Sequence, residues 1–280
     1  MLRPRELEAG IELFPAQTPT LLPATHTNSY ALGEGDVLLV EPATPYPDEQ
    51  RAWLDWAEDL ARRGRRLLAI LLTHHHVDHV GGAGRLSKEL GLPLWAHPKT
   101  AERLEELDVS RTLDDGDEIR LEGAPDQLWR VLHTPGHAPG HLCLHEASSG
   151  TLVVGDMVAS IGTILIAPGD GDMRVYLEQL ARLAALDSRT ALPAHGEPIG
   201  QPSQLFSHYI RHRLMRESKV IEALESAGSR GGTADDLLPH AYADTSRETW
   251  PIARLSLVSH LEKLIQEQRA KLDGDRYFPA

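Results

Sequence analysis

Residues 73–79, with the sequence THHHVDH, form the densest group of side chains in this chain that can bind a metal ion. They follow an apolar run at 67–72, which predicts a strand buried on both faces. His74 and His76 alternate along the chain, so in an extended segment both point to one side. Asp78 and His79 come just after a turn and can reach a second point a few ångströms away. Imidazole and carboxylate groups at this density suit zinc, iron or manganese. A run of solvated surface histidines is the alternative, and position argues against it, because the run begins where a buried strand ends.

Three more potential ligands follow at strand ends or in loops bordered by Gly and Pro. His137 lies in the segment HTPGHAPGH, Asp156 directly follows an apolar strand expected at 151–154, and His195 follows a strand expected at 190–194. One such residue would mean little by itself. Their repetition in the same setting, together with the histidine cluster, predicts a shared metal site.

The elements that must position these residues begin with short strands and a few helices. We expect strands at 11–14, 29–32, 37–40, 67–72, 93–96, 118–121, 128–133, 141–145, 151–154 and 190–194, and helices near 48–63, 80–90 and 172–186. The pattern changes after Pro202. Helical periodicity then predicts three helices, one of them capped by Thr233, before a hairpin turn at Asp273-Gly274. This is the element order of a winged helix, so we predict a catalytic domain at 1–201 and a winged-helix-like domain at 202–280.

Composition limits the class of protein and its partners. The 280 residues include a single cysteine, Cys143, which excludes an internal disulfide. That favours a reducing compartment, and we expect a cytoplasmic protein with no membrane span and no apolar run of a signal peptide near its start. Residues 201–280 carry equal numbers of acidic and basic side chains, so the net charge of −13 comes entirely from the first 200. An acidic body repels polyanions, which counts against nucleic acid as a ligand.

These motifs together resemble the metallo-β-lactamase superfamily, over about residues 20 to 200. The resemblance implies an α+β fold, an αββα sandwich with the site at one edge. It implies that His74, His76 and His137 bind a first metal, that Asp78, His79 and His195 bind a second, and that Asp156 bridges both. It also implies that a hydroxide held between two divalent ions is the nucleophile, with Asp78 and Asp156 as catalytic carboxylates. Zinc is the expected metal, and manganese or iron are alternatives.

Nearby residues are not assigned as ligands. His75 points away from His74 and His76, His141 is expected to pack or hydrogen-bond, and Cys143 is expected in the core. Glu41 marks a departure from the family, which usually has aspartate after its early apolar strand, where it orients the histidine loop.

Within the superfamily the chain most resembles the β-lactamase-like protein 2 group, which includes a single-strand RNA endonuclease. Residues 168–173 with Tyr176, and residues 208–213 opening the C-terminal module, carry this resemblance. Polyketide thioesterases of the same fold resemble this group too. Two substrate classes therefore compete, a small ester or thioester and an RNA phosphodiester. Arg211, Arg213, Arg216 and Lys219 favour RNA, whereas the acidic body and the lack of an aromatic-rich basic stripe favour the small ester or thioester. We favour the small ester or thioester, with RNA as the alternative.

Two further alternatives concern the C-terminal module. A metal-binding winged-helix regulatory protein without enzymatic activity is disfavoured, because all seven ligand positions are filled. The module itself follows His195 closely, so we expect it either to limit what enters the site or to form a homodimer.

Overall fold

The computed structural model describes residues 3–280, and these residues divide into two compact units. The first unit contains residues 3–134, 139–163 and 187–202, and the second contains residues 135–138, 164–186 and 203–280. Each unit has a hydrophobic core of its own. The domain boundary between residues 201 and 202 stays a prediction, because two internal segments of the chain group with the C-terminal residues.

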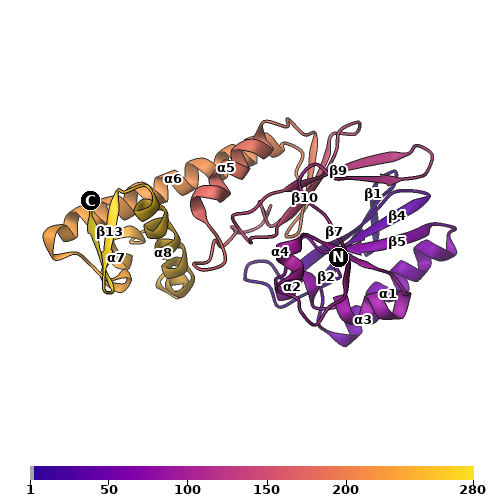
Figure 1. Cartoon of the computed structure of the whole chain (residues 1–280), viewed down its shortest axis with the longest axis horizontal. Coiled ribbons are helices and arrows are strands. Elements are labelled where there is room, and N and C mark those ends of the chain that lie inside the picture. Colours follow the sequence, from indigo (N-terminus) through magenta and orange to yellow (C-terminus); the bar gives the residue numbers. More distant parts are fainter. Residues whose placement is uncertain (1–2) are drawn as a thin grey trace. The chain divides into compact units, whose positions relative to one another are not determined.

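The first unit contains a seven-stranded sheet whose strands follow the order of the chain (Figure 1). The strands are β1 (Arg5–Glu8), β2 (Ile11–Gln17), β3 (His26–Leu32), β4 (Asp36–Val40), β5 (Arg66–Leu71), β6 (Leu94–Ala96) and β7 (Val109–Thr112). Neighbours are antiparallel from β1 to β4 and parallel from β4 to β7. The sequence pattern missed β1 and β7, because neither strand has the apolar alternation of a half-buried strand.

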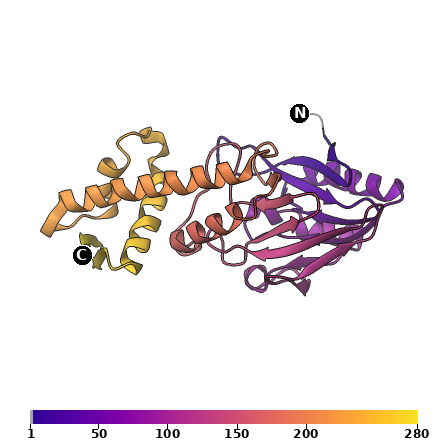
Figure 2. The same cartoon turned by 90° about the horizontal axis from the view of Figure 1, so that it is seen from above.

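A second sheet of the first unit has five strands. In spatial order they are β12 (Thr190–Pro193), β11 (Thr151–Gly155), β10 (Leu142–Glu146), β9 (Gln127–His133) and β8 (Glu118–Leu121). The β11–β12 pair is parallel and the other pairs are antiparallel. Figure 2 shows the strands of the two sheets from above.

Strand β4 shows how the layers of the first unit are held together. Leu38 and Val40 lie in the core between the two sheets, whereas Val37 and Leu39 lie in a core on the other face. Successive side chains of a strand point to opposite faces, so a strand buried on both faces is apolar throughout. The outer core is completed by helices α1 (Pro47–Arg62) and α3 (Ala83–Leu90), which Figure 1 shows beside each other, and Trp53 of α1 is fully buried there.

The expected helix at 80–90 is divided in two. A short helix α2 (Val77–Val80) is separated from α3 by Gly81-Gly82. A β-carbon on Gly82 would lie 2.8 Å from the carbonyl oxygen of Pro42, which accepts the Gly82 N–H, so only glycine fits this close approach. A further short helix, α4 (Pro98–Ala101), was not expected from the sequence.

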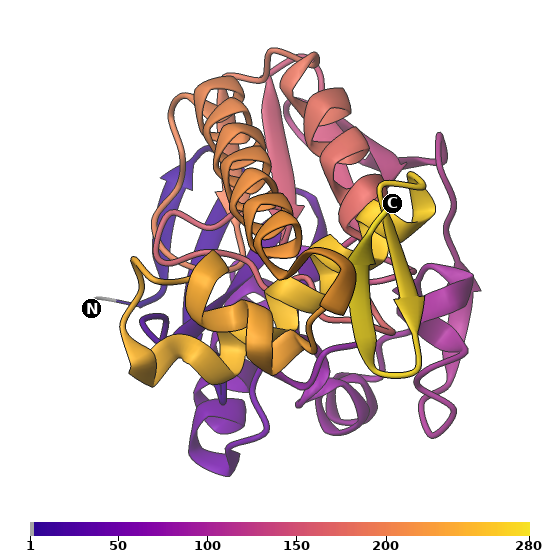
Figure 3. The same ribbon diagram turned by 90° about the vertical axis from the view of Figure 1, so that its left-hand side faces the viewer.

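The second unit contains helices and a hairpin. The α-helices are α5 (Met173–Ala184), α6 (Pro202–Ala227), α7 (Ala234–Ala241) and α8 (Trp250–Gln266), with short 3₁₀ turns at Gly228–Arg230 and Arg247–Thr249, and the hairpin consists of β13 (Ala270–Asp273) and β14 (Arg276–Pro279). Figure 2 shows α6 as one continuous helix, and Figure 3 shows the hairpin beside the C-terminal helices. Thr233 caps α7 in a capping box with Asp236, as the sequence predicts for the cap. The core of this module contains Val220, Leu237 and Leu257.

No helix among residues 3–280 combines the length and the apolar character that crossing a membrane requires.

Candidate metal centre

Four strands of the first unit bring chemically active residues to one edge. Glu41 follows β4, residues 73–79 follow β5, Asp156 follows β11 and His195 follows β12. Both strand pairs, β4–β5 and β11–β12, are parallel, so their carboxyl ends lie together. A hydrogen bond of 2.9 Å from the Leu142 N–H to the Thr73 carbonyl joins the two sheets at this edge. The topology thus collects residues from four separate parts of the sequence.

The residues predicted for the second metal converge in the structure. Asp78, His79 and His195 offer ligand atoms that all lie within 4.8 Å of one another. The predicted bridging residue is beside them: Asp156 Oδ2 lies 3.6 Å from His79 Nε2, and Asp156 Oδ1 lies 3.3 Å from His195 Nε2. The ligand atoms of these four side chains are therefore close enough together to bind a metal ion.

His74 and His76, predicted for the first metal, also converge. His74 Nε2 and His76 Nδ1 are 3.0 Å apart. His137 belongs to the second unit, in the segment 135–138, so it is described with that unit and stays a predicted ligand of the first metal. The chain enters and leaves this four-residue segment through Thr134 and Pro139 of the first unit.

The hydrogen bonds of the imidazoles fit metal coordination. His195 Nδ1 lies 3.0 Å from the carbonyl oxygen of His26, and His137 Nδ1 lies 2.9 Å from that of Leu165. A carbonyl oxygen only accepts, so both Nδ1 atoms carry the proton and both Nε2 atoms keep a lone pair for a metal. His79 is fully buried, and its Nε2 finds no hydrogen-bond partner among residues 3–280. A buried imidazole nitrogen of this kind fits a metal ligand.

The electrostatics of the cluster also favour cations. Burial by itself would lower the pKa of His79, but the carboxylates of Glu41, Asp156 and Asp78 outweigh burial and raise it well above its ordinary value. Burial would likewise raise the pKa of Asp156, but His195 and His79 outweigh it and lower that pKa well below its ordinary value. The cluster thus holds an excess of negative charge that binds protons, and metal ions would take their place.

Asp156 is held by its own neighbours. Its backbone N–H donates to His141 Nε2 at 3.0 Å, and His141 Nδ1 lies 2.8 Å from the hydroxyl of Thr134. His141 is therefore a hydrogen-bonding residue, as the sequence predicts. Gly155 has φ 48°, and a β-carbon there would lie 2.5 Å from His141 Nε2, so the residue before Asp156 has to be glycine.

Glu41, which directly follows β4, contacts the histidine loop. Its Oε1 accepts the Thr73 N–H at 3.3 Å, and its Oε2 lies 3.3 Å from His79 Nδ1. Glu41 has φ 63°, and the hydroxyl of Ser29 donates to its carbonyl oxygen. The longer carboxylate thus reaches both the start of the histidine loop, by a hydrogen bond, and one predicted ligand, as an ion-pair partner.

We expect Glu41→Gln to weaken binding of the second metal by about 10- to 100-fold. The amide oxygen can still accept the Thr73 N–H, but the negative charge that lies 3.3 Å from His79 Nδ1 is lost. Asp36→Asn is the matched control, because Asp36 lies at the other end of β4 and pairs with Arg66. Zinc titration of chelator-stripped protein measures both. Equal affinities in the two variants would show that Glu41 does not orient His79.

A further histidine pair lies elsewhere in the first unit. The rings of His97 and His133 stack with centroids 3.9 Å apart, and Asp114 lies beside them. His97 Nδ1 accepts the Lys99 N–H at 3.1 Å, so its proton is on Nε2, which faces Asp114 Oδ1 at 3.6 Å. Burial and the neighbouring His133 lower the pKa of His97 to about 4. His97 is therefore the neutral cap of α4, with its ring stacked on that of His133.

A sandwich that gathers histidines and carboxylates at the carboxyl ends of its strands defines a metal-dependent hydrolase. The model of the metallo-beta-lactamase superfamily matches residues 22–195, and the model of the beta-lactamase associated winged helix domain matches residues 233–277. The chain belongs to the metallo-β-lactamase superfamily. The predicted αββα fold, the C-terminal winged helix and the assignment as a metal-dependent hydrolase are confirmed.

Named relatives include two kinds of protein. A beta-lactamase-like protein 2 homolog of Drosophila melanogaster is 27% identical over 264 residues, which cover 91% of this chain and 87% of that protein. An atrochrysone carboxyl ACP thioesterase of Paecilomyces divaricatus is 31% identical over 254 residues, which cover 89% of this chain and 75% of that protein. The crystal structure of a metallo-beta-lactamase family protein from Thermus thermophilus has a TM-score of 0.78 at 26% identity, covering 98% of this chain and 100% of that one.

Proposed function

We propose that this protein is a dinuclear metal-dependent hydrolase of small acyl thioesters or esters. The convergence of Asp78, His79, Asp156 and His195, with His195 Nδ1 bonded to the His26 carbonyl outside the cluster, carries the proposal. Zinc is the metal we expect, since two or more imidazoles with carboxylates suit it, and manganese or iron would suit the same donors.

The seven predicted ligands divide between two ions. We assign His74, His76 and His137 to the first metal, Asp78, His79 and His195 to the second, and Asp156 to both. When bound, the two ions would supply an activated water and an electrophile for the charge that develops on the substrate oxygen. Asp156 and Asp78 hold this arrangement with two carboxylates, whose positions His141 and the short helix α2 fix.

The basic residues of α6 argue against an RNA substrate. Arg216 and Lys219 both donate to Asp244, at 2.6 and 2.7 Å. Arg213 is buried and donates to the carbonyl oxygen of Ile164. Phosphate groups would have to displace these partners, so three of the four cations that favoured RNA in the sequence are committed inside the second unit.

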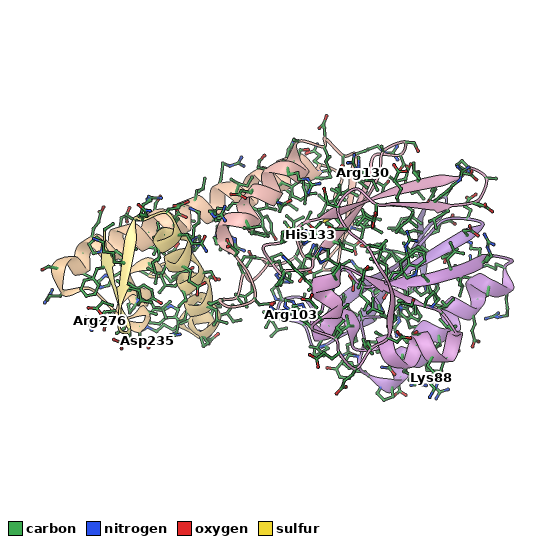
Figure 4. All side chains as sticks on the ribbon, viewed as in Figure 1. Lys88, Arg103, Arg130, His133, Asp235 and Arg276 are labelled. Carbon is green, nitrogen blue, oxygen red and sulfur yellow. The ribbon has the colours of Figure 1, made fainter. Side chains whose placement is uncertain are left out.

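Basic side chains of the winged helix are also paired within the second unit. On α8, Lys263 is buried and pairs with Glu217 at 2.7 Å, and Arg254 pairs with Asp235 at 2.6 Å. Arg276 of the hairpin, labelled in Figure 4, donates to the carbonyl of Gly231 at 2.9 Å. A nucleic-acid-binding winged helix needs cations available for phosphates, which supports a different role for this module.

Exposed apolar side chains near the metal centre support an acyl substrate. Val77, which is 56% exposed, stands between two predicted ligands in the histidine motif. Ile161, 40% exposed, contacts the glycine that follows His195. Leu22 is 81% exposed, and Pro23 after it contacts the glycine that follows Ile161. Apolar groups of a bound acyl chain would remove this surface from water. The relative named as an acyl-carrier-protein thioesterase agrees with this choice.

Three finer expectations remain part of the proposal. A cytoplasmic location follows from the single cysteine, Cys143, which is buried in β10. The C-terminal module would either limit what enters the site or form a homodimer. The alternative of a regulatory protein without activity is disfavoured by the intact ligand set.

The deciding assay uses one metal-loaded preparation and its Asp156→Ala variant. Both are tested on acyl thioesters of increasing chain length and on labelled single-stranded RNA at two salt concentrations. We expect thioester turnover that the variant lacks, with kcat/KM rising up to about fourfold per buried methylene, because each contributes about 0.8 kcal/mol. RNA cleavage that the variant lacks and that falls with salt, without thioester turnover, would overturn the substrate assignment.

A further inference from the structure

Three consecutive carbonyl groups of the second unit are held by residues from different elements. The carbonyl of Ile164 accepts a hydrogen bond from Arg213 of α6. The carbonyl of Leu165 accepts from His137 Nδ1 at 2.9 Å. The carbonyl of Ile166 accepts from the hydroxyl of Ser259 on α8, at 2.6 Å. Residues 164–166, named here the carbonyl strap, are thus fixed on both sides of the one carbonyl that faces His137.

The donors of this strap are buried, so the hydrogen bonds are shielded from water. Arg213 is 3% exposed and Ser259 is 2% exposed, and the side chains of Ile164 and Ile166 are buried as well. A buried carbonyl with a buried partner keeps its direction, because losing the hydrogen bond would leave a polar group unsatisfied. Arg213 and Ser259, both of the second unit, therefore set the direction of the Leu165 carbonyl.

The segment that carries His137 is packed equally closely. A β-carbon on Gly136, at φ 129°, would lie 2.4 Å from the backbone of Tyr176 on α5. The carbonyl of Gly136 accepts the Asp172 N–H at 2.8 Å, at the start of the same helix. Arg213 also lies over the ring of Tyr176, 5.8 Å from its centroid. One arginine thus touches both the strap and the helix that supports the His137 backbone.

We propose that Arg213 and Ser259 are positioning residues for the first metal, acting through the carbonyl strap on His137. The strap holds the proton of His137 on Nδ1 and keeps the ring from rotating, so that Nε2 is presented as a ligand. The second unit then positions one predicted ligand through contacts of its own. This inference rests on the proposed function, since it takes His137 as a ligand.

The test measures binding of Zn²⁺ and Co²⁺ to the full-length protein after its metal has been removed with a chelator. We expect Arg213→Met and Ser259→Ala each to lower the affinity for one of the two ions by about 10- to 100-fold. The affinity for the other ion should stay unchanged. The absorption spectrum of the cobalt form should change for the weakened ion only. Ser259→Thr keeps the hydroxyl and should restore the affinity of the parent protein.

Two control variants match these changes. Ser226→Ala removes a hydroxyl of α6 that bonds only the preceding turn, and Arg254→Met removes an arginine of α8 that pairs with Asp235. Both should bind two ions like the parent, and thermal unfolding of the metal-free proteins separates stability from affinity. If Arg213→Met fails to fold, the Ser259→Ala and Ser259→Thr pair decides.

His137→Ala separates this inference from the proposed function. If that variant keeps two ions with parental affinities, the ligand assignment itself is wrong. If it loses one ion while Arg213→Met and Ser259→Ala bind both ions like the controls, the strap has no positioning role and the proposed function stands.

Discussion

Asp78→Asn is expected to lose the second metal and to lower kcat/KM on an acyl thioester by about 10³-fold, because several kcal/mol of transition-state stabilisation depend on that ion. Asp78 lies in α2 with its side chain 15% exposed, so the isosteric amide should leave the fold intact. Metal content by elemental analysis and steady-state kinetics measure the two effects.

His75→Gln is the control for this change, because His75 lies in the same motif and is not a predicted ligand. It should keep both ions and most of the activity. His79→Ala is a less clean variant than Asp78→Asn, since His79 is fully buried and its removal takes away the ion-pair partner of Glu41 Oε2. Two retained ions in Asp78→Asn would show that the ligands have been divided wrongly between the metals.

Deleting residues 203–280 is expected to yield an aggregating protein that binds one metal fewer. The deletion removes Arg213 and Ser259 from the carbonyl strap. It also removes α8, on which α5 packs, and the Ser203 hydroxyl that bonds the Ala184 carbonyl at 3.1 Å. Apolar residues of α5 would then lose buried partners. Size-exclusion chromatography and metal analysis check this outcome.

The truncated protein could instead remain monodisperse and keep both ions. A monodisperse truncated protein with two bound ions and unchanged kcat/KM on short and long acyl thioesters would end both the positioning role and any gating role of the module. Selective gain of activity on larger substrates, with two ions retained, would support gating and contradict the positioning role.

The sequence alone indicated the elements with strong local patterns. The strands β4, β5 and β11 are apolar along most of their length, because strands covered on both faces need no alternation. Strands β1 and β7 were not predicted, because they are largely polar and lie at the edges of their sheet. The break between α2 and α3 was not predicted for another reason. In the sequence, Gly81-Gly82 could equally begin a helix, and only the close approach of Pro42 in the structure explains the interruption.

For the metal centre, the sequence determined which side chains are available and the tertiary structure decided how they are held. The histidine motif and the Gly- and Pro-bordered loops carry their chemistry in the residue types themselves. The partners of these residues are distant in sequence: Glu41 reaches His79, His26 accepts from His195, and Leu165 accepts from His137. Two of these acceptors are backbone carbonyls, which every residue has, so no side-chain pattern could have identified them. Which imidazole nitrogen is left for a metal therefore depends on parallel strand pairing and packing, and only the folded chain decides it.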